Sequence, residues 1–181
     1  VSLRIRMTLS LRFAIRAGYA PEGEFMAGDR VIDADRHPAL ALALRTGVLC
    51  NDARLMYEDP QGRAVPSPPP EGGAKSWGGA ALSRAGQWSV LGDPTEGALL
   101  VLGRKAGLAQ VHTEAAWPRS DSIPFESQHR FMATAHRDDE GEPWIFVKGA
   151  PEKLFDISVC ELGPEGERPI VVVDMHAEAT S

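Results

Sequence analysis

The stretch WIFVKGAPEKLF, residues 144–155, contains the signals of a strand, a tight turn and a helix start. The apolar run WIFV predicts a buried strand. Gly149 and Ala150 follow as a turn, and Pro151 suits the first position of a helix, where its missing N–H does no harm. Lys148 therefore ends an apolar strand directly before a turn. A positive charge in that place is either solvated at an ordinary strand end or faces an anionic ligand.

A second extended run, IPFESQHRFMATAH (residues 123–136), precedes this stretch. The acidic, glycine-containing segment RDDEGE separates the two runs, which is typical of a β-hairpin. With the turn in the middle of that segment, antiparallel pairing places Lys148 opposite Phe131 and Met132. Arg130 then lies close by, and Phe125 lies just beyond the paired residues.

Two helices are predicted upstream of the hairpin. HPALALALRTGVLCND (residues 37–52) places Leu40, Leu44 and Val48 on one helical face, with Pro38 at the first position.

The second helix is predicted from GDPTEGALLVLGRKAG (residues 92–107). Asp93 is a natural N-cap and Pro94 occupies the first helical position. Glu96 completes a capping-box pattern, and Gly107 follows basic residues as a helix stop.

Length and composition indicate one soluble domain that covers residues 1–181. The chain is 43% hydrophobic and 24% charged, with a net charge of -6 that argues against nucleic-acid binding. Residues 59–87 are rich in proline and glycine and are expected to form a mobile insertion. The final residues look like a helix that is cut short, so we expect the C-terminal end of the domain to be truncated. The predicted fold is α+β, an antiparallel sheet with helices packed against it.

Several of these side chains suit a purine nucleotide. Phe125 can stack on a base, while Lys148 and Arg130 can meet phosphates or a purine edge. Glu96 can accept a hydrogen bond from an exocyclic amino group, and Gly149 lets the backbone approach a flat ligand. Each residue also has a structural explanation: a capping box for the glutamate, the core for the phenylalanine and solvent for the arginine.

No metal site is predicted. His129 and His136 lie on opposite faces of a strand, and the other histidines and the two cysteines lack ligand-like spacing.

Three motifs in the same order also carry a family resemblance: GDPTEGALL, IPFESQHRFMA and VKGAPEKLF. Together they resemble the nucleotide-binding (N) domain of P-type cation-transporting ATPases, most closely the type II group. GYAPEGEF and GVLCNDARL resemble that domain as well, and RMT is similar to the residues that enter it.

The resemblance implies an ATP pocket on a twisted antiparallel sheet flanked by helices, which delivers the γ-phosphate to an aspartate of a separate phosphorylation domain. It implies that Phe125 stacks on adenine, that Lys148 lines the inner pocket, and that Arg130 lies near the phosphates. The same carry-over places Glu96 at the adenine, with Met132 and Gly149 in the pocket wall.

The resemblance further implies a cytoplasmic domain of an integral membrane protein, with phosphorylation and actuator domains as partners and with Mg²⁺ accompanying ATP in the parent. The aspartate-lysine-threonine-glycine-threonine phosphorylation motif is missing from the sequence. We therefore expect this domain to bind ATP without hydrolysing it. The alternatives are a non-catalytic interaction module and a self-contained phosphohydrolase, although we find no nucleophile or carboxylate set for the latter.

Overall fold

The computed structural model describes residues 6–7, 19–21, 23–27, 29–59, 61–66, 86–163 and 166–169. The helices are η1 (Ala34–Arg36), α1 (Pro38–Leu49), α3 (Pro94–Lys105), α4 (Gln110–Ala116) and α5 (Pro151–Ile157). The strands are β1 (Arg6–Met7), β2 (Phe25–Ala27), β3 (Arg30–Ile32), β4 (Arg54–Glu58), β5 (Ala64–Pro66), β6 (Gln87–Leu91), β7 (Arg119–Ile123), β8 (Phe131–Arg137), β9 (Pro143–Gly149), β10 (Cys160–Gly163) and β11 (Gly166–Pro169).

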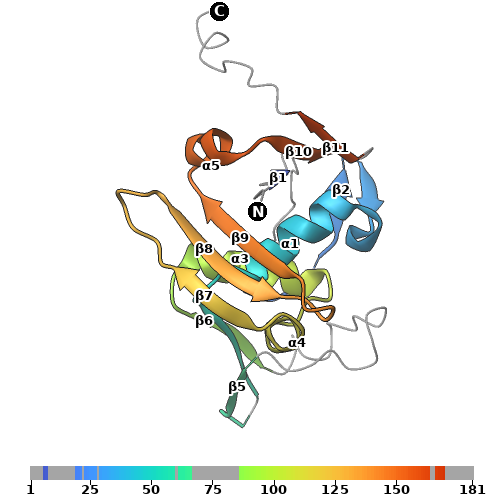
Figure 1. Ribbon diagram of the computed structural model, residues 1–181. Coiled ribbons are helices and arrows are strands. Elements are labelled where there is room, and N and C mark those ends of the chain that lie inside the picture. The colour runs from blue at the N-terminus through green and yellow to red at the C-terminus, as the bar shows by residue number, and fades with distance from the viewer. Residues whose placement is uncertain are drawn as a thin grey trace, which may run out of the picture.

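Among the described residues, the strands form several small sheets. Their orders are β7-β8-β9, β5-β4-β6, β1-β10-β11 and β2-β3. All described pairs are antiparallel except β1 with β10. Helix α1 runs behind the β7-β8-β9 sheet and contacts both α3 and β9 (Figure 1). The mixed α and β architecture is confirmed, with its antiparallel sheet divided into several parts.

The predicted hairpin is confirmed in register, because Met132 pairs with Lys148 and Phe131 pairs with Gly149. The first extended run is shorter than predicted: β7 ends at Ile123, and residues 124–130 form a loop before β8. Pro124 has no N–H for a ladder, and Arg130 has a positive φ of 60°, so neither residue suits a continuous strand.

Both predicted helices are confirmed. In α1, the shared face of Leu40, Leu44 and Val48 is buried. In α3, the Asp93 carboxylate accepts hydrogen bonds from the backbone N–H groups of Thr95 and Glu96, at 2.7 and 3.1 Å. Helix α5 begins at Pro151 as predicted.

The described part of the predicted insertion at residues 59–87 includes strand β5 and the start of β6. Strand β5 pairs with β4, so that Glu58 lies opposite Ala64. The Asp59 carboxylate closes the connecting turn by accepting from the N–H groups of Gln61 and Arg63, at 3.0 and 2.9 Å. Residues 67–85 and 170–181 lie outside the described part of the chain, and the predicted helix that is cut short falls in the second of these segments.

The core beneath the β8–β9 hairpin supports the candidate site. Leu49 and Cys50, at the end of α1, pack with Met132 and Phe146 of the hairpin, and all four are at most 3% exposed. Trp117 and Trp144, whose rings meet edge to face, pack against this cluster. The hairpin is thereby fixed against the C-terminal end of α1. In the described residues no helix is both long enough and apolar enough to cross a membrane.

Candidate functional site

Lys148 and Glu96 form the centre of the candidate site. Lys148 pairs across β8–β9 with the buried Met132, so both side chains lie on the sheet face that covers α1. Its ammonium group forms an ion pair with Oε1 of Glu96, in the first turn of α3. The two side chains are only 22% and 19% exposed. The charge that ends the apolar strand is thus neutralised by a carboxylate in a partly desolvated place.

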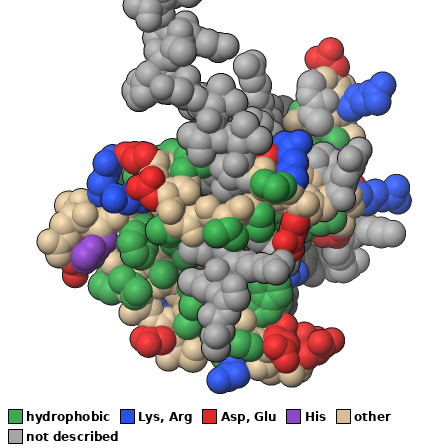
Figure 2. Space-filling model, turned by 45° about the horizontal axis from the view of Figure 1, so that its top comes forward, with side chains coloured by type: hydrophobic (Ala, Val, Ile, Leu, Met, Phe, Trp, Pro, Cys, Tyr) green, Lys and Arg blue, Asp and Glu red, His purple; other side chains and the backbone are tan. Residues whose placement is uncertain are grey.

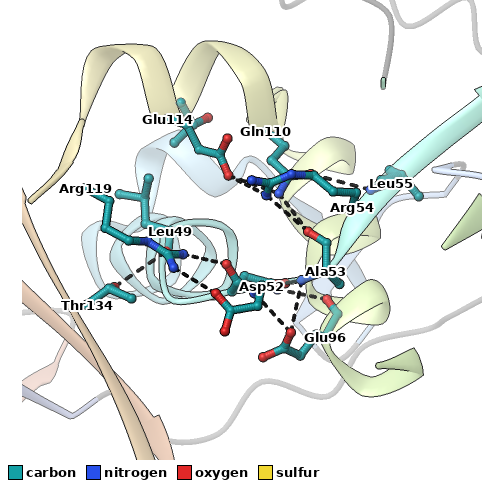
Figure 3. Close-up of polar contacts among 12 residues, drawn as sticks. Leu49, Asp52, Ala53, Arg54, Leu55, Glu96, Gln110, Glu114, Arg119 and Thr134 are labelled. Carbon is teal, nitrogen blue, oxygen red and sulfur yellow. Dashed lines mark hydrogen bonds and ion pairs between the residues drawn. The ribbon is translucent and has the colours of Figure 1, made fainter. Parts of the chain in front are cut away.

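The carboxylate of Glu96 is held on its other side by the turn between α1 and β4 (Figure 3). Its Oε2 accepts hydrogen bonds from the backbone N–H groups of Asp52 and Ala53, at 3.0 and 3.1 Å. The side chain of Glu96 therefore crosses to another segment instead of closing the predicted capping box with Asp93. The N–H groups of Asp52 and Ala53 therefore take the place of the Asp93 N–H that a capping box would use.

Arg119 holds the same turn from the opposite side. The guanidinium donates to Oδ1 of Asp52 at 2.7 Å and to the carbonyl oxygens of Leu49 and Asn51 at 3.0 and 2.5 Å. A cation at these carbonyls also complements the negative end of the α1 dipole. No local sequence pattern singles out this arginine, because its partners lie 67 to 70 positions away.

Phe125 lies in the loop between β7 and β8, and 60% of the residue is exposed. The structural explanation, in which this ring fills the core, is therefore wrong. In the same loop, Oε2 of the next residue, Glu126, lies 3.3 Å from Nε2 of His129. Figure 2 shows hydrophobic side chains gathered beside a mixed group of acidic and basic ones on one face of the molecule. An exposed aromatic ring next to charged groups can stack on a flat ligand.

Arg130 follows this loop in the left-handed region, with φ of 60°. Its carbonyl accepts a hydrogen bond from the N–H of Ala150 at 2.9 Å, and its guanidinium forms an ion pair with Glu152. Both side chains of that pair are about half exposed, at 52% and 53%. The cation that the resemblance places near phosphates is therefore accessible, and it has an internal carboxylate partner.

Gly149 has a packing role that the sequence did not reveal. A Cβ at this position would lie 2.4 Å from the carbonyl oxygen of Arg130 and 2.6 Å from Cβ of Phe131. Glycine is thus required here because the backbone of residue 149 approaches the neighbouring strand closely. Met132 is 1% exposed, so its side chain supports the hairpin from below and is not open to a ligand.

The structure therefore brings the predicted residues together in two groups. Lys148 and Glu96 form one, and Gly149 and Arg130 form the other at the end of the same hairpin. Phe125 belongs to neither ion pair and projects from the loop that leads to Arg130.

The pKa values of two titratable groups near the site are shifted by their surroundings. The N–H of Glu96 holds the pKa of Asp93 below its ordinary value, and burial raises the pKa of the Cys50 thiol. The described residues contain no group of three or more histidine, cysteine, aspartate or glutamate side chains that would suit a metal ion. Neither shift supplies a nucleophile to this site.

Comparison with known proteins defines the class. The family described as P-type ATPase, cytoplasmic domain N, matches residues 39–167. The chain belongs to this family of P-type ATPase N domains.

Among curated relatives, the cation-transporting ATPase pma1 of Synechocystis is 39% identical over 155 residues, which are 83% of this chain and 14% of that relative. The calcium-transporting ATPase of Bacillus subtilis is 28% identical over 142 residues, which are 78% of this chain and 13% of the relative. Calcium-transporting ATPase 1 of Lactococcus lactis is 40% identical over 77 residues, 42% of this chain and 8% of the relative. The chain thus spans a small fraction of the length of each relative.

Proposed function

We propose that this chain is the ATP-binding domain of a cation-transporting P-type ATPase, on the cytoplasmic side of a membrane. It holds adenine so that the γ-phosphate reaches an aspartate on a separate phosphorylation domain. The observation that carries the proposal is the Lys148–Glu96 pair, because it places a cation at the end of the hairpin beside a hydrogen-bond acceptor on α3. The names of the relatives, cation- and calcium-transporting ATPases, support the same assignment.

Recognition of adenine begins with the ring of Phe125, which is exposed and able to stack on a base. Glu96 supplies selectivity. An ionised carboxylate offers about four acceptor sites, and here two N–H groups and one ammonium group occupy three of them. The remaining site is on Oε1, beside Lys148, where it can accept from the 6-amino group of adenine.

The triphosphate meets a cation at the end of the hairpin. Arg130 is half exposed and leaves Glu152 to pair with phosphate oxygens. Mg²⁺ enters with the triphosphate, and we assign it no ligand in this chain. The contribution of the domain is positional, since phosphoryl transfer depends on placing the reacting groups and stabilising their charge.

An NMR titration of the labelled chain with ATP tests the proposal. We expect saturable shifts at Lys148 and Gly149. Phe125→Ala should weaken binding by roughly 1–3 kcal/mol, the usual worth of one base–aromatic stack. Leu91→Ala is the matched control, because it removes a 68% exposed apolar side chain from a different sheet. No shifts at millimolar ATP would overturn the proposal in favour of a non-catalytic interaction module.

A further inference from the structure

We infer that Arg119 is a positioning residue for the Glu96–Lys148 pair and thereby sets the preference of the site for 6-amino purines. The inference deepens the proposed function and rests on it. Arg119 lies at the first position of β7, and the loop that carries Phe125 follows the end of the same strand. One residue therefore links the strand that leads to the stacking ring with the turn that holds the acceptor.

The contacts of Arg119 are directional. A guanidinium presents its N–H groups in a rigid planar fork. Nη1 donates to the Asp52 carboxylate, and Nη2 donates to the carbonyl oxygens of Leu49 and Asn51 (Figure 3). A lysine in this place would keep the charge and lose the fork.

The link to Glu96 runs through a single peptide group. The carbonyl of Asn51 and the N–H of Asp52 belong to the same peptide plane, which is rigid and trans, so they point in opposite directions. Arg119 binds the carbonyl at 2.5 Å, and the N–H donates to Oε2 of Glu96 at 3.0 Å. Fixing one end of this plane aims the other end at the carboxylate.

The residues on either side of Asp52 transmit this orientation because they are buried and hydrogen-bonded. Asn51 and Ala53 are both 0% exposed. The amide nitrogen of Asn51 donates to the carbonyls of Gly47 and Glu96 at 2.8 and 2.9 Å, and its amide oxygen accepts from the N–H of Ala53 at 2.9 Å. A turn held this way presents both N–H groups to Oε2 together.

The consequence concerns the other carboxylate oxygen. While two N–H groups occupy Oε2, the carboxylate cannot rotate, and Oε1 keeps one acceptor site beside Lys148. Without the guanidinium fork the peptide plane is free to tilt. Oε2 then loses its N–H donors and competes with Oε1 for the ammonium group of Lys148. The site thereby loses its fixed acceptor, and with it the preference for purines that carry a 6-amino group.

The test compares ATP with inosine triphosphate, whose base carries an oxo group in place of the 6-amino group, on Arg119→Lys and Arg119→Gln chains. We expect the ATP-to-ITP affinity ratio to fall roughly two- to tenfold, the range of one net hydrogen bond. NMR of the Asp52 and Ala53 amides and of the Lys148 ammonium group should show shifts before any nucleotide is added. Arg137→Gln is the matched control, because it removes a donor to the Gly141 carbonyl at 2.9 Å in the same sheet.

An equal loss of affinity for both nucleotides would overturn the inference, since general damage does not distinguish the bases. Unchanged amide and ammonium signals in Arg119→Lys would overturn it as well. These signals need no ligand, so they test the positioning role even if the wild-type chain fails to bind ATP. Failure to bind ATP would overturn the proposed function alone. If Arg119→Gln does not fold, Arg119→Lys, which retains the charge, carries the test.

Discussion

Lys148 and Glu96 lie 52 positions apart in the sequence and meet in an ion pair at the N-terminal end of α3. The pair joins the hairpin to a helix that packs against α1 and β4. A lysine at the end of an apolar strand thus has a structural partner even without ligand. The same contact that completes the fold also leaves a cation and an acceptor in one place.

Lys148→Met should lower the free energy of unfolding by about 1 kcal/mol, because it removes the ammonium partner of Glu96, whose side chain is only 19% exposed. Urea denaturation measures the change. Arg36→Gln serves as control, since its ion pair with Asp33 is 84% and 61% exposed and should contribute less than about 0.5 kcal/mol. Equal losses in the two variants would contradict a special role for the Lys148 pair.

Gly149→Ala should destabilise the hairpin by about 1–3 kcal/mol, the usual cost of forcing extra atoms into a packed place. The new methyl group would meet the carbonyl of Arg130 at 2.4 Å, and backbone cannot move aside as a side-chain end can. The control is Gly163→Ala, where the nearest atom is 3.6 Å away. Thermal unfolding of both chains would show whether the clash matters, and equal midpoints would refute it.

Asn51→Ala should cost about 1–3 kcal/mol, because it removes a fully buried side-chain donor to the carbonyls of Gly47 and Glu96. The N–H of Ala53 also loses one acceptor. Hydrogen exchange at Ala53 should accelerate more than the global loss of stability explains. Exchange that follows global unfolding alone would mean that Asn51 does not hold the turn locally.

Acidification should destabilise the chain through His136. Burial lowers the pKa of this histidine below its ordinary value of 6.5. Nδ1 lies 2.8 Å from the Trp117 carbonyl, and Nε2 is buried without a partner among the described residues. The unfolded chain therefore binds more protons, so stability is complete above pH 6.5 and falls as the pH drops below it.

Nearby charges act in both directions on this histidine, with Arg119 disfavouring protonation and Glu114 favouring it. Unfolding curves between pH 7 and 5 test the expectation. His136→Gln should flatten the pH dependence, whereas His112→Gln, at an exposed position of α4, should leave it intact. A wild-type slope that survives His136→Gln would assign the effect to another group.

Local signals in the sequence predicted those parts of the fold that depend on neighbours along the chain. Pro38 and Asp93 mark helix starts, and the hairpin register follows from the acidic turn and the two runs around it. Helix α4 carries no such signal, because its N-cap, Ala109, offers no side-chain acceptor.

The contacts of the candidate site residues were not predictable from the sequence. Glu96 matched a capping box, yet donors from a turn more than 40 positions away engage its carboxylate. Arg119 begins a strand that is exposed at every position, so no periodicity distinguishes it. Its importance is visible only once α1 and β7 lie together.

The labelling rate of the Cys50 thiol can report how often the hairpin opens. The thiol is 0% exposed and lies 3.5 Å from the carbonyl of Met132, directly beneath the strand pair that carries Lys148. A thiol reagent can reach it only when β8 separates from the end of α1, so the labelling rate in native buffer reports that equilibrium. Any ligand that binds the closed form slows labelling in proportion to its occupancy. Labelling at Cys50, resolved from labelling at the half-buried Cys160, therefore measures how tightly the site is held without observing the ligand itself.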